Sequence, residues 1–79
     1  METESKLRKK FDTVIRELDI RFPELDLRYN FQSGNSSMRF YVADIDSNVM
    51  ELDLRSVSAM SILHEATFCV KQTVRQFDA

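Results

Sequence analysis

Residues 25–42 read LDLRYNFQSGNSSMRFYV, two segments of alternating apolar and polar residues joined by a cluster of turn-forming residues. The apolar positions are Leu25, Leu27, Tyr29 and Phe31 in the first segment and Met38, Phe40 and Val42 in the second. Because successive side chains of a β-strand point to opposite faces, each segment predicts a strand with one buried face. The intervening SGNSS sequence, residues 33–37, favours a tight connection. We therefore expect an antiparallel hairpin.

A third segment has the same period, since Met50, Leu52 and Leu54 alternate with charged residues. The short DIDSN segment, residues 44–48, predicts the second turn. The expected pairs of the first hairpin are Leu27–Val42, Tyr29–Phe40 and Phe31–Met38. Those of the second hairpin are Val42–Met50, Phe40–Leu52 and Met38–Leu54. On the outer face, Arg39 is expected opposite Asp53. Both registers place the apolar residues on one face, which a slip of one residue would reverse.

The regions on either side of these strands have helical period. Residues 5 to about 20 carry a single apolar stripe formed by Leu7, Phe11, Val14, Ile15, Leu18 and Phe22. Ser5 is the expected N-cap, and Pro23 predicts that this helix ends near Asp19. Residues 57–77 form the second helix, with Ser56 or Ser58 as its cap. Its predicted buried half comprises Ala59, Met60, Ile62, Leu63, Ala66, Cys69, Val70, Val74 and Phe77.

These elements predict an α+β fold in the order α-β-β-β-α, a three-stranded antiparallel meander with two helices on one face. At 79 residues, the chain has the length of one small domain, which we assign to residues 1–79. The single cysteine cannot form an internal disulfide, which suits a reducing compartment. Because the sequence lacks an apolar segment typical of a signal peptide or a membrane span, we expect a cytoplasmic protein.

The segment ILHEATFCVK, residues 62–71, contains the only histidine and the only cysteine. A zinc-protease motif would need a second histidine at the position of Phe68. His64 and Cys69 are five residues apart, so that their side chains point about 140° apart on a helix. The loop at residues 44–55 has Asp44, Asp46 and Asn48 at calcium-ligand positions, but Val49 and Arg55 stand where glycine and glutamate are needed. We expect no metal, no cofactor and no catalytic site, and hence not an enzyme.

The element order resembles that of double-stranded-RNA-binding domains over nearly the whole chain. That family uses a basic run at the start of its second helix to contact phosphates. The matching segment, SVSAMSILHE (residues 56–65), contains no lysine or arginine. The resemblance therefore implies a similar fold without the residues that carry the family's function, and the chain is not assigned to that family.

Phe68 is an exception to the pattern, because it lies on the polar side of the second helix, opposite the apolar stripe. His64, Lys71 and Arg75 lie around it, and an aromatic ring beside arginine is typical of an interface anchor. Exposed apolar residues are also common without any function, so an incidental Phe68 is the other interpretation. Tyr41, at the centre of the outer sheet face, is a further candidate contact.

These residues predict a non-enzymatic protein–protein interaction module of the adaptor, accessory or inhibitor type. Its partner is another protein of unknown identity, and a sheet edge would also suit a second copy of the chain in a homodimer. The alternative is nucleic-acid binding through the basic cluster Lys6, Arg8, Lys9 and Lys10. The formal net charge of −2 makes general nucleic-acid binding the weaker hypothesis.

Overall fold

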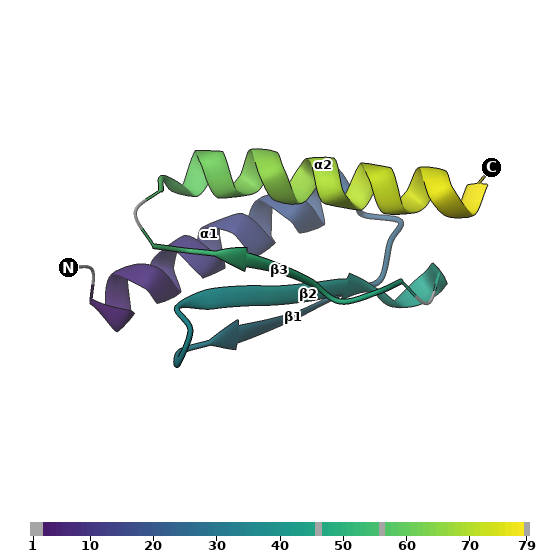
Figure 1. Cartoon of the computed structure of the whole chain (residues 1–79). Helices are drawn as coiled ribbons and strands as arrows, with labels where there is room; N and C mark the ends of the chain where they lie inside the picture. Colours follow the sequence, from purple (N-terminus) through teal and green to yellow (C-terminus); the bar gives the residue numbers. More distant parts are fainter. Residues whose placement is uncertain (1–2, 46, 56, 79) are drawn as a thin grey trace.

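The computed structural model describes residues 3–45, 47–55 and 57–78. Its elements, in chain order, are α1 (Glu4–Arg21), β1 (Leu27–Gln32), β2 (Ser37–Val42), the short 3₁₀ helix η1 (Ala43–Ile45), β3 (Met50–Asp53) and α2 (Ala59–Asp78). The strands form one antiparallel sheet in the order β1-β2-β3, and both helices lie on the same side of it (Figure 1). The predicted α-β-β-β-α fold is therefore confirmed. Neither helix has the length and apolar composition needed to cross a membrane.

The register of the first hairpin is as predicted, with Leu27 opposite Val42 and Phe31 opposite Met38. The register predicted for the second hairpin is wrong by two residues. Phe40 is paired with Met50, where Leu52 was expected, and Arg39 is paired with Glu51, where Asp53 was expected.

The backbone of Val42 explains this shift. Its N–H donates to Ser47 Oγ at 2.7 Å, and its carbonyl oxygen accepts from the Ser47 backbone N–H at 3.3 Å. Ser47 thus pairs with the two backbone groups of Val42, the residue that was predicted to lie opposite Met50. The connection is also held against the start of β1, since the Asp26 backbone N–H donates to the Asp44 carboxylate at 2.6 Å. This contact gives Asp44 a structural role, whereas Asp46 lies outside the described residues.

Both helices begin with a side-chain cap, which supplies an acceptor to an otherwise unpaired backbone N–H. Thr3 caps α1 by accepting from the Lys6 N–H at 3.2 Å, so the prediction of Ser5 is wrong. Ser58 accepts from the Ser61 N–H at 3.2 Å, as predicted, and Ser56 lies outside the described residues. The end of α1 lies two residues beyond the predicted Asp19, because Phe22 still donates to the Leu18 carbonyl at 2.9 Å.

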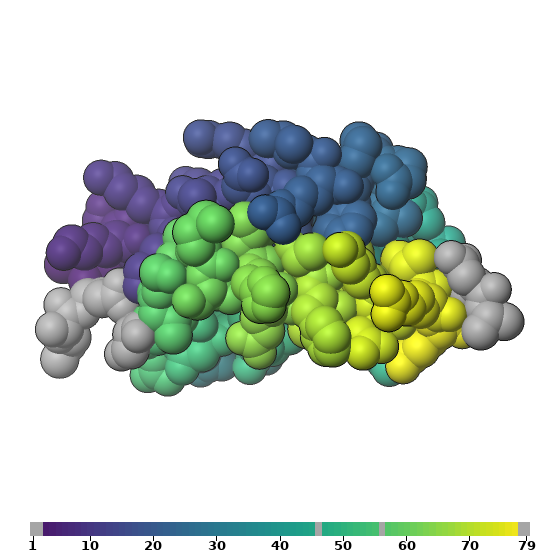
Figure 2. All heavy atoms as spheres, turned by 90° about the horizontal axis from the view of Figure 1, so that it is seen from above, coloured from purple at the N-terminus to yellow at the C-terminus, as the bar shows by residue number. Residues whose placement is uncertain are grey.

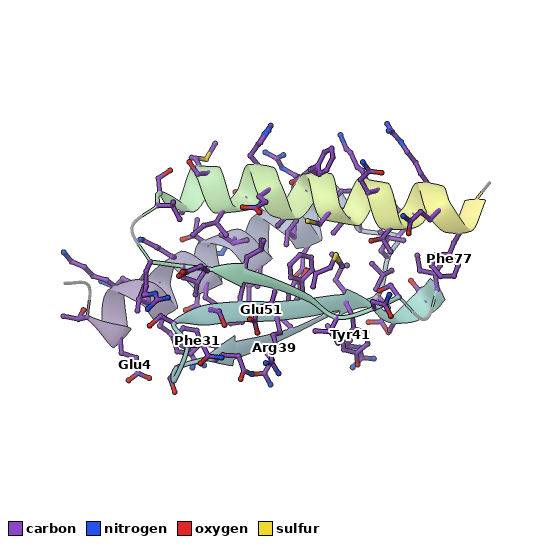
Figure 3. The ribbon with its side chains drawn as sticks, viewed as in Figure 1. Glu4, Phe31, Arg39, Tyr41, Glu51 and Phe77 are labelled. Atoms are coloured by element: carbon purple, nitrogen blue, oxygen red, sulfur yellow. The ribbon has the colours of Figure 1, made fainter. Side chains whose placement is uncertain are left out.

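The core lies between the sheet and the two helices. Its buried apolar residues are Leu7, Phe11, Val14 and Leu18 from α1, Leu27, Met38, Phe40, Val42, Leu52 and Leu54 from the sheet region, and Ile62, Leu63, Ala66 and Val70 from α2. Met60 and Phe77 were predicted to be buried and are not, with 69% and 56% of their surfaces exposed. The 20 residues of α2 span about 30 Å, whereas the four residues of β3 span about 13 Å. The end turns of α2 therefore extend past the strand beneath them, and Figure 3 shows Phe77 at the end next to η1.

Tyr29 links β1 to α1, because its hydroxyl donates to Asp19 Oδ1 at 2.7 Å. Burial, followed by this hydrogen bond, raises the pKa of Tyr29 above its ordinary value. A raised pKa in the folded state means that the neutral phenol contributes stability below about pH 10, and that this contribution is lost as the pH rises beyond that value.

We therefore expect Tyr29→Phe to lower the free energy of unfolding at pH 7 by about 1 kcal/mol. The difference between wild type and variant should shrink above pH 10, as the wild-type phenol ionises. Urea unfolding at a series of pH values measures both effects. Tyr41→Phe, on the opposite face of the sheet, is the matched control and should lower the free energy of unfolding at pH 7 by much less. A difference in the free energy of unfolding between wild type and Tyr29→Phe that stays constant to high pH would contradict the role assigned to the Tyr29 hydroxyl.

Candidate functional site

The face of α2 that points away from the sheet carries five exposed side chains in one line. Met60, His64, Phe68, Lys71 and Arg75 follow one another at intervals of four, four, three and four residues, which places them along one side of a helix. We call this set the outer stripe. Figure 3 shows side chains projecting from α2 on this side, with no second layer above the helix. The four residues of α2 that were predicted as a contact surface, His64, Phe68, Lys71 and Arg75, therefore lie on one face. Met60 lies on the same face and was not predicted.

The outer stripe contains two large apolar side chains. Phe68 is 57% exposed, as predicted, and Met60 is 69% exposed. Within the described part of the chain, neither belongs to the buried core or to the apolar residues packed against it. Full burial of such a side chain is worth about 1.5–3 kcal/mol, so roughly half of that free energy is unrealised for each. A partner that covered both side chains would gain it.

Sequence reasoning missed Met60 because a helical wheel placed it at the margin of the apolar half. The signal that identifies it is its spacing, since Met60 lies two turns before Phe68 with His64 between them. In the structure Met60 lies on the outward side of α2, with 69% of its surface exposed. Val57, just before the helix, is also exposed.

The outer stripe carries two positive charges, on Lys71 and Arg75. Among the described residues, the side chains of Lys71 and Arg75 have no hydrogen-bonding or ion-pairing partner. The sheet differs, since its arginines pair with neighbouring acids, in the pairs Arg28–Asp26, Arg39–Glu51 and Arg55–Asp53. The side-chain and backbone hydrogen bonds from Arg55 lower the pKa of Asp53. The outer stripe therefore offers positive charge to a partner, while the sheet charges are already matched.

Tyr41 lies on a different surface from the outer stripe. Figure 3 shows Tyr41 with Arg39 and Glu51 on the side of the sheet that faces away from the helices. Its side chain is 39% exposed. Because the sheet and the core lie between Tyr41 and α2, one small contact cannot include both Tyr41 and Phe68. The structure thus separates the predicted protein-binding residues into two candidate surfaces.

The basic cluster of α1 is divided among different surroundings. The Arg8 guanidinium lies over the Phe31 ring, 5.1 Å from its centroid, and so faces β1. The Lys10 ammonium donates to the Leu54 carbonyl at 3.1 Å and so faces the opposite side of α1. Lys6 and Lys9 are exposed. The four cations do not form one continuous face.

Cys69 and His64 occupy different environments on α2. His64 is exposed, whereas Cys69 is partly buried. Burial, and then the nearby Glu65 carboxylate, raises the pKa of the Cys69 thiol, so that the protonated form predominates at neutral pH. In residues 3–45, 47–55 and 57–78, no three His, Cys, Asp or Glu side chains are grouped as metal ligands would be.

Comparison of the chain with protein-family models, curated proteins and solved structures finds no match.

Proposed function

We propose that this chain is a small non-enzymatic protein–protein interaction module, of the adaptor, accessory or inhibitor type, that binds its partner through the outer stripe of α2. The observation that carries the proposal is the 57% exposure of the Phe68 side chain on the outward face of α2. Aromatic residues, methionine and arginine are the types enriched at the centres of protein interfaces. The outer stripe combines all three.

The arrangement of the exposed apolar residues supports this surface over others. Ile20 and Val49 are also exposed, but they lie on α1 and in the connection before β3. Single exposed apolar residues of that kind are common and need no function. On α2, Met60 and Phe68 share one face with two cations, Lys71 and Arg75, that have no partner in the part of the chain that the structure describes. A partner can therefore gain apolar burial and charge pairing from the same helix.

The alternative, nucleic-acid binding through α1, has less support. Arg8 and Lys10 each contact the chain's own residues, and a groove that follows a phosphate backbone requires a continuous basic surface. A complex of this kind would weaken steeply with salt.

Site-specific photo-crosslinking in the native cell tests the proposal. A photoreactive benzoylphenylalanine in place of Phe68 should form a protein adduct of defined mass, because the ring is expected to lie within the contact. The matched control carries the same group in place of Tyr41, on the opposite surface, and should form no such adduct. An adduct from position 41 alone would show that the partner contacts the outer face of the sheet and not the outer stripe. The absence of adducts from both positions, or adducts that nuclease digestion removes, would reject the proposal.

A further inference from the structure

A small apolar groove lies beside the C-terminal half of the outer stripe. Its apolar lining comes from Phe22, Leu25 and Val74, and its volume is about 210 Å³. Figure 2, which looks onto the helices, shows the segment after α1 beside the C-terminal half of α2. The turn around Pro23 builds one wall, since the Leu25 N–H donates to the Phe22 carbonyl at 3.2 Å. The groove thus joins two parts of the chain that are distant in sequence.

The rim of this groove is mainly positive. Lys71 and Arg75 lie along it, and Glu24 is its one carboxylate among the described residues. Arg21 adds a third cation nearby, held by a hydrogen bond from its guanidinium to Thr67 Oγ1 at 3.4 Å. Lys71 and Arg75 are four residues apart and so are neighbours on the helix surface. Because neither side chain has a partner among the described residues, both are available to carboxylates.

We propose that this groove binds an acidic peptide segment of the protein partner. One apolar side chain of the segment packs against Phe22, Leu25 and Val74, and its carboxylates pair with Lys71 and Arg75. This inference rests on the proposed function and specifies the chemistry of the partner.

The size and charge of the groove favour this occupant. A volume of about 210 Å³ admits one or two side chains and is below the roughly 300–1,000 Å³ typical of small-molecule sites. An apolar lining contributes nothing to phosphate binding, whereas a peptide side chain can pack against it. A peptide with both apolar and acidic side chains uses the lining and the rim together. Arginine can also hold a carboxylate through two parallel hydrogen bonds.

A designed peptide provides the probe. We would titrate the full chain with a short fluorescent peptide of alternating leucine and glutamate pairs, and with a matched peptide that has lysine in place of each glutamate. The acidic peptide should raise the fluorescence anisotropy and shift the amide resonances of Leu25, Val74 and Arg75. The basic peptide should do neither. Binding by both peptides, or shifts confined to the sheet, would overturn the inference.

Charge reversal locates the binding. The double variant Lys71→Glu/Arg75→Glu should weaken binding of the acidic peptide at least about tenfold, because two attractive pairs become repulsive. The control Lys6→Glu/Lys9→Glu changes the net charge equally at the other end of α1, and should weaken binding less than about twofold. Equal losses in the two variants would show a general charge effect and overturn the inference. So would preferential binding to phosphatidylserine-containing vesicles, or a dimer in light scattering that the Lys71/Arg75 variant disrupts.

The two proposals fail in different ways. A protein adduct from position 68, with no binding of the acidic peptide in the groove, rejects the acidic segment and leaves the interaction module standing. Peptide binding in the groove with no adduct from position 68 or position 41 rejects the proposed interaction through the outer stripe and leaves the acidic-peptide groove standing.

Discussion

Replacing Phe68 with aspartate is expected to abolish association with the partner while lowering the free energy of unfolding by only about 1 kcal/mol, the part of its apolar burial that the folded chain already realises. The side chain is 57% exposed and lies outside the buried core, so its loss leaves no cavity. In the complex, the variant loses binding free energy in two ways. The apolar burial of the ring is missing, and the new carboxylate must be desolvated. Truncation of a central interface aromatic commonly costs about 2–4 kcal/mol, a decrease in affinity of roughly 30- to 1,000-fold. Calorimetric titration with the partner identified by crosslinking, together with urea unfolding, measures both quantities.

Val49→Asp is the matched control for this experiment. Val49 is another exposed apolar residue, but it lies before β3 and close to Tyr41, away from the outer stripe. Its replacement introduces the same charge and should leave affinity unchanged. A Phe68→Asp protein that unfolds would show that the ring is structural. A variant that binds normally would show that its exposure is incidental.

The face of each strand could be predicted from sequence, whereas the second register could not. Alternation fixes which residues of β2 and β3 point inward, and a shift of two residues preserves that alternation. Phe40 therefore faces the core whether it pairs with Leu52 or with Met50. The choice between these registers depends on how Ser47 pairs with Val42. A hydroxyl that completes a turn in this way has no distinct sequence pattern.

The exposure of Phe68 could be predicted because it lies in the middle of α2, directly opposite the apolar stripe. The same method failed for Met60, which lies at the margin of the apolar half. It failed for Phe77 because a helical wheel carries no information about where the sheet ends. The groove was also beyond sequence reasoning. Its walls come from the turn after α1 and from the last turns of α2, and only the packing of the two helices brings these together.

The largest expected loss of stability comes from Phe40→Ala. Phe40 is fully buried in the central strand, opposite Tyr29 and Met50. Truncation of a buried phenylalanine costs about 3–5 kcal/mol through lost burial and the remaining cavity. A domain of 79 residues has a total stability of roughly 4–12 kcal/mol. We therefore expect a large drop in the midpoint of urea unfolding and, at the lower end of that range, a largely unfolded population.

Tyr41→Ala is the control for Phe40→Ala, because Tyr41 is the next residue on the same strand and points to the opposite face. With 39% of its surface exposed, it should cost about 1 kcal/mol or less. Equal losses would contradict the assignment of the two faces of β2. The pair also separates two causes of weak binding. Phe40→Ala should reduce the apparent affinity only in proportion to the unfolded fraction, whereas Phe68→Asp should remove binding from a fully folded chain. A binding defect in a chain that remains folded is therefore the result that assigns a role in recognition to a side chain.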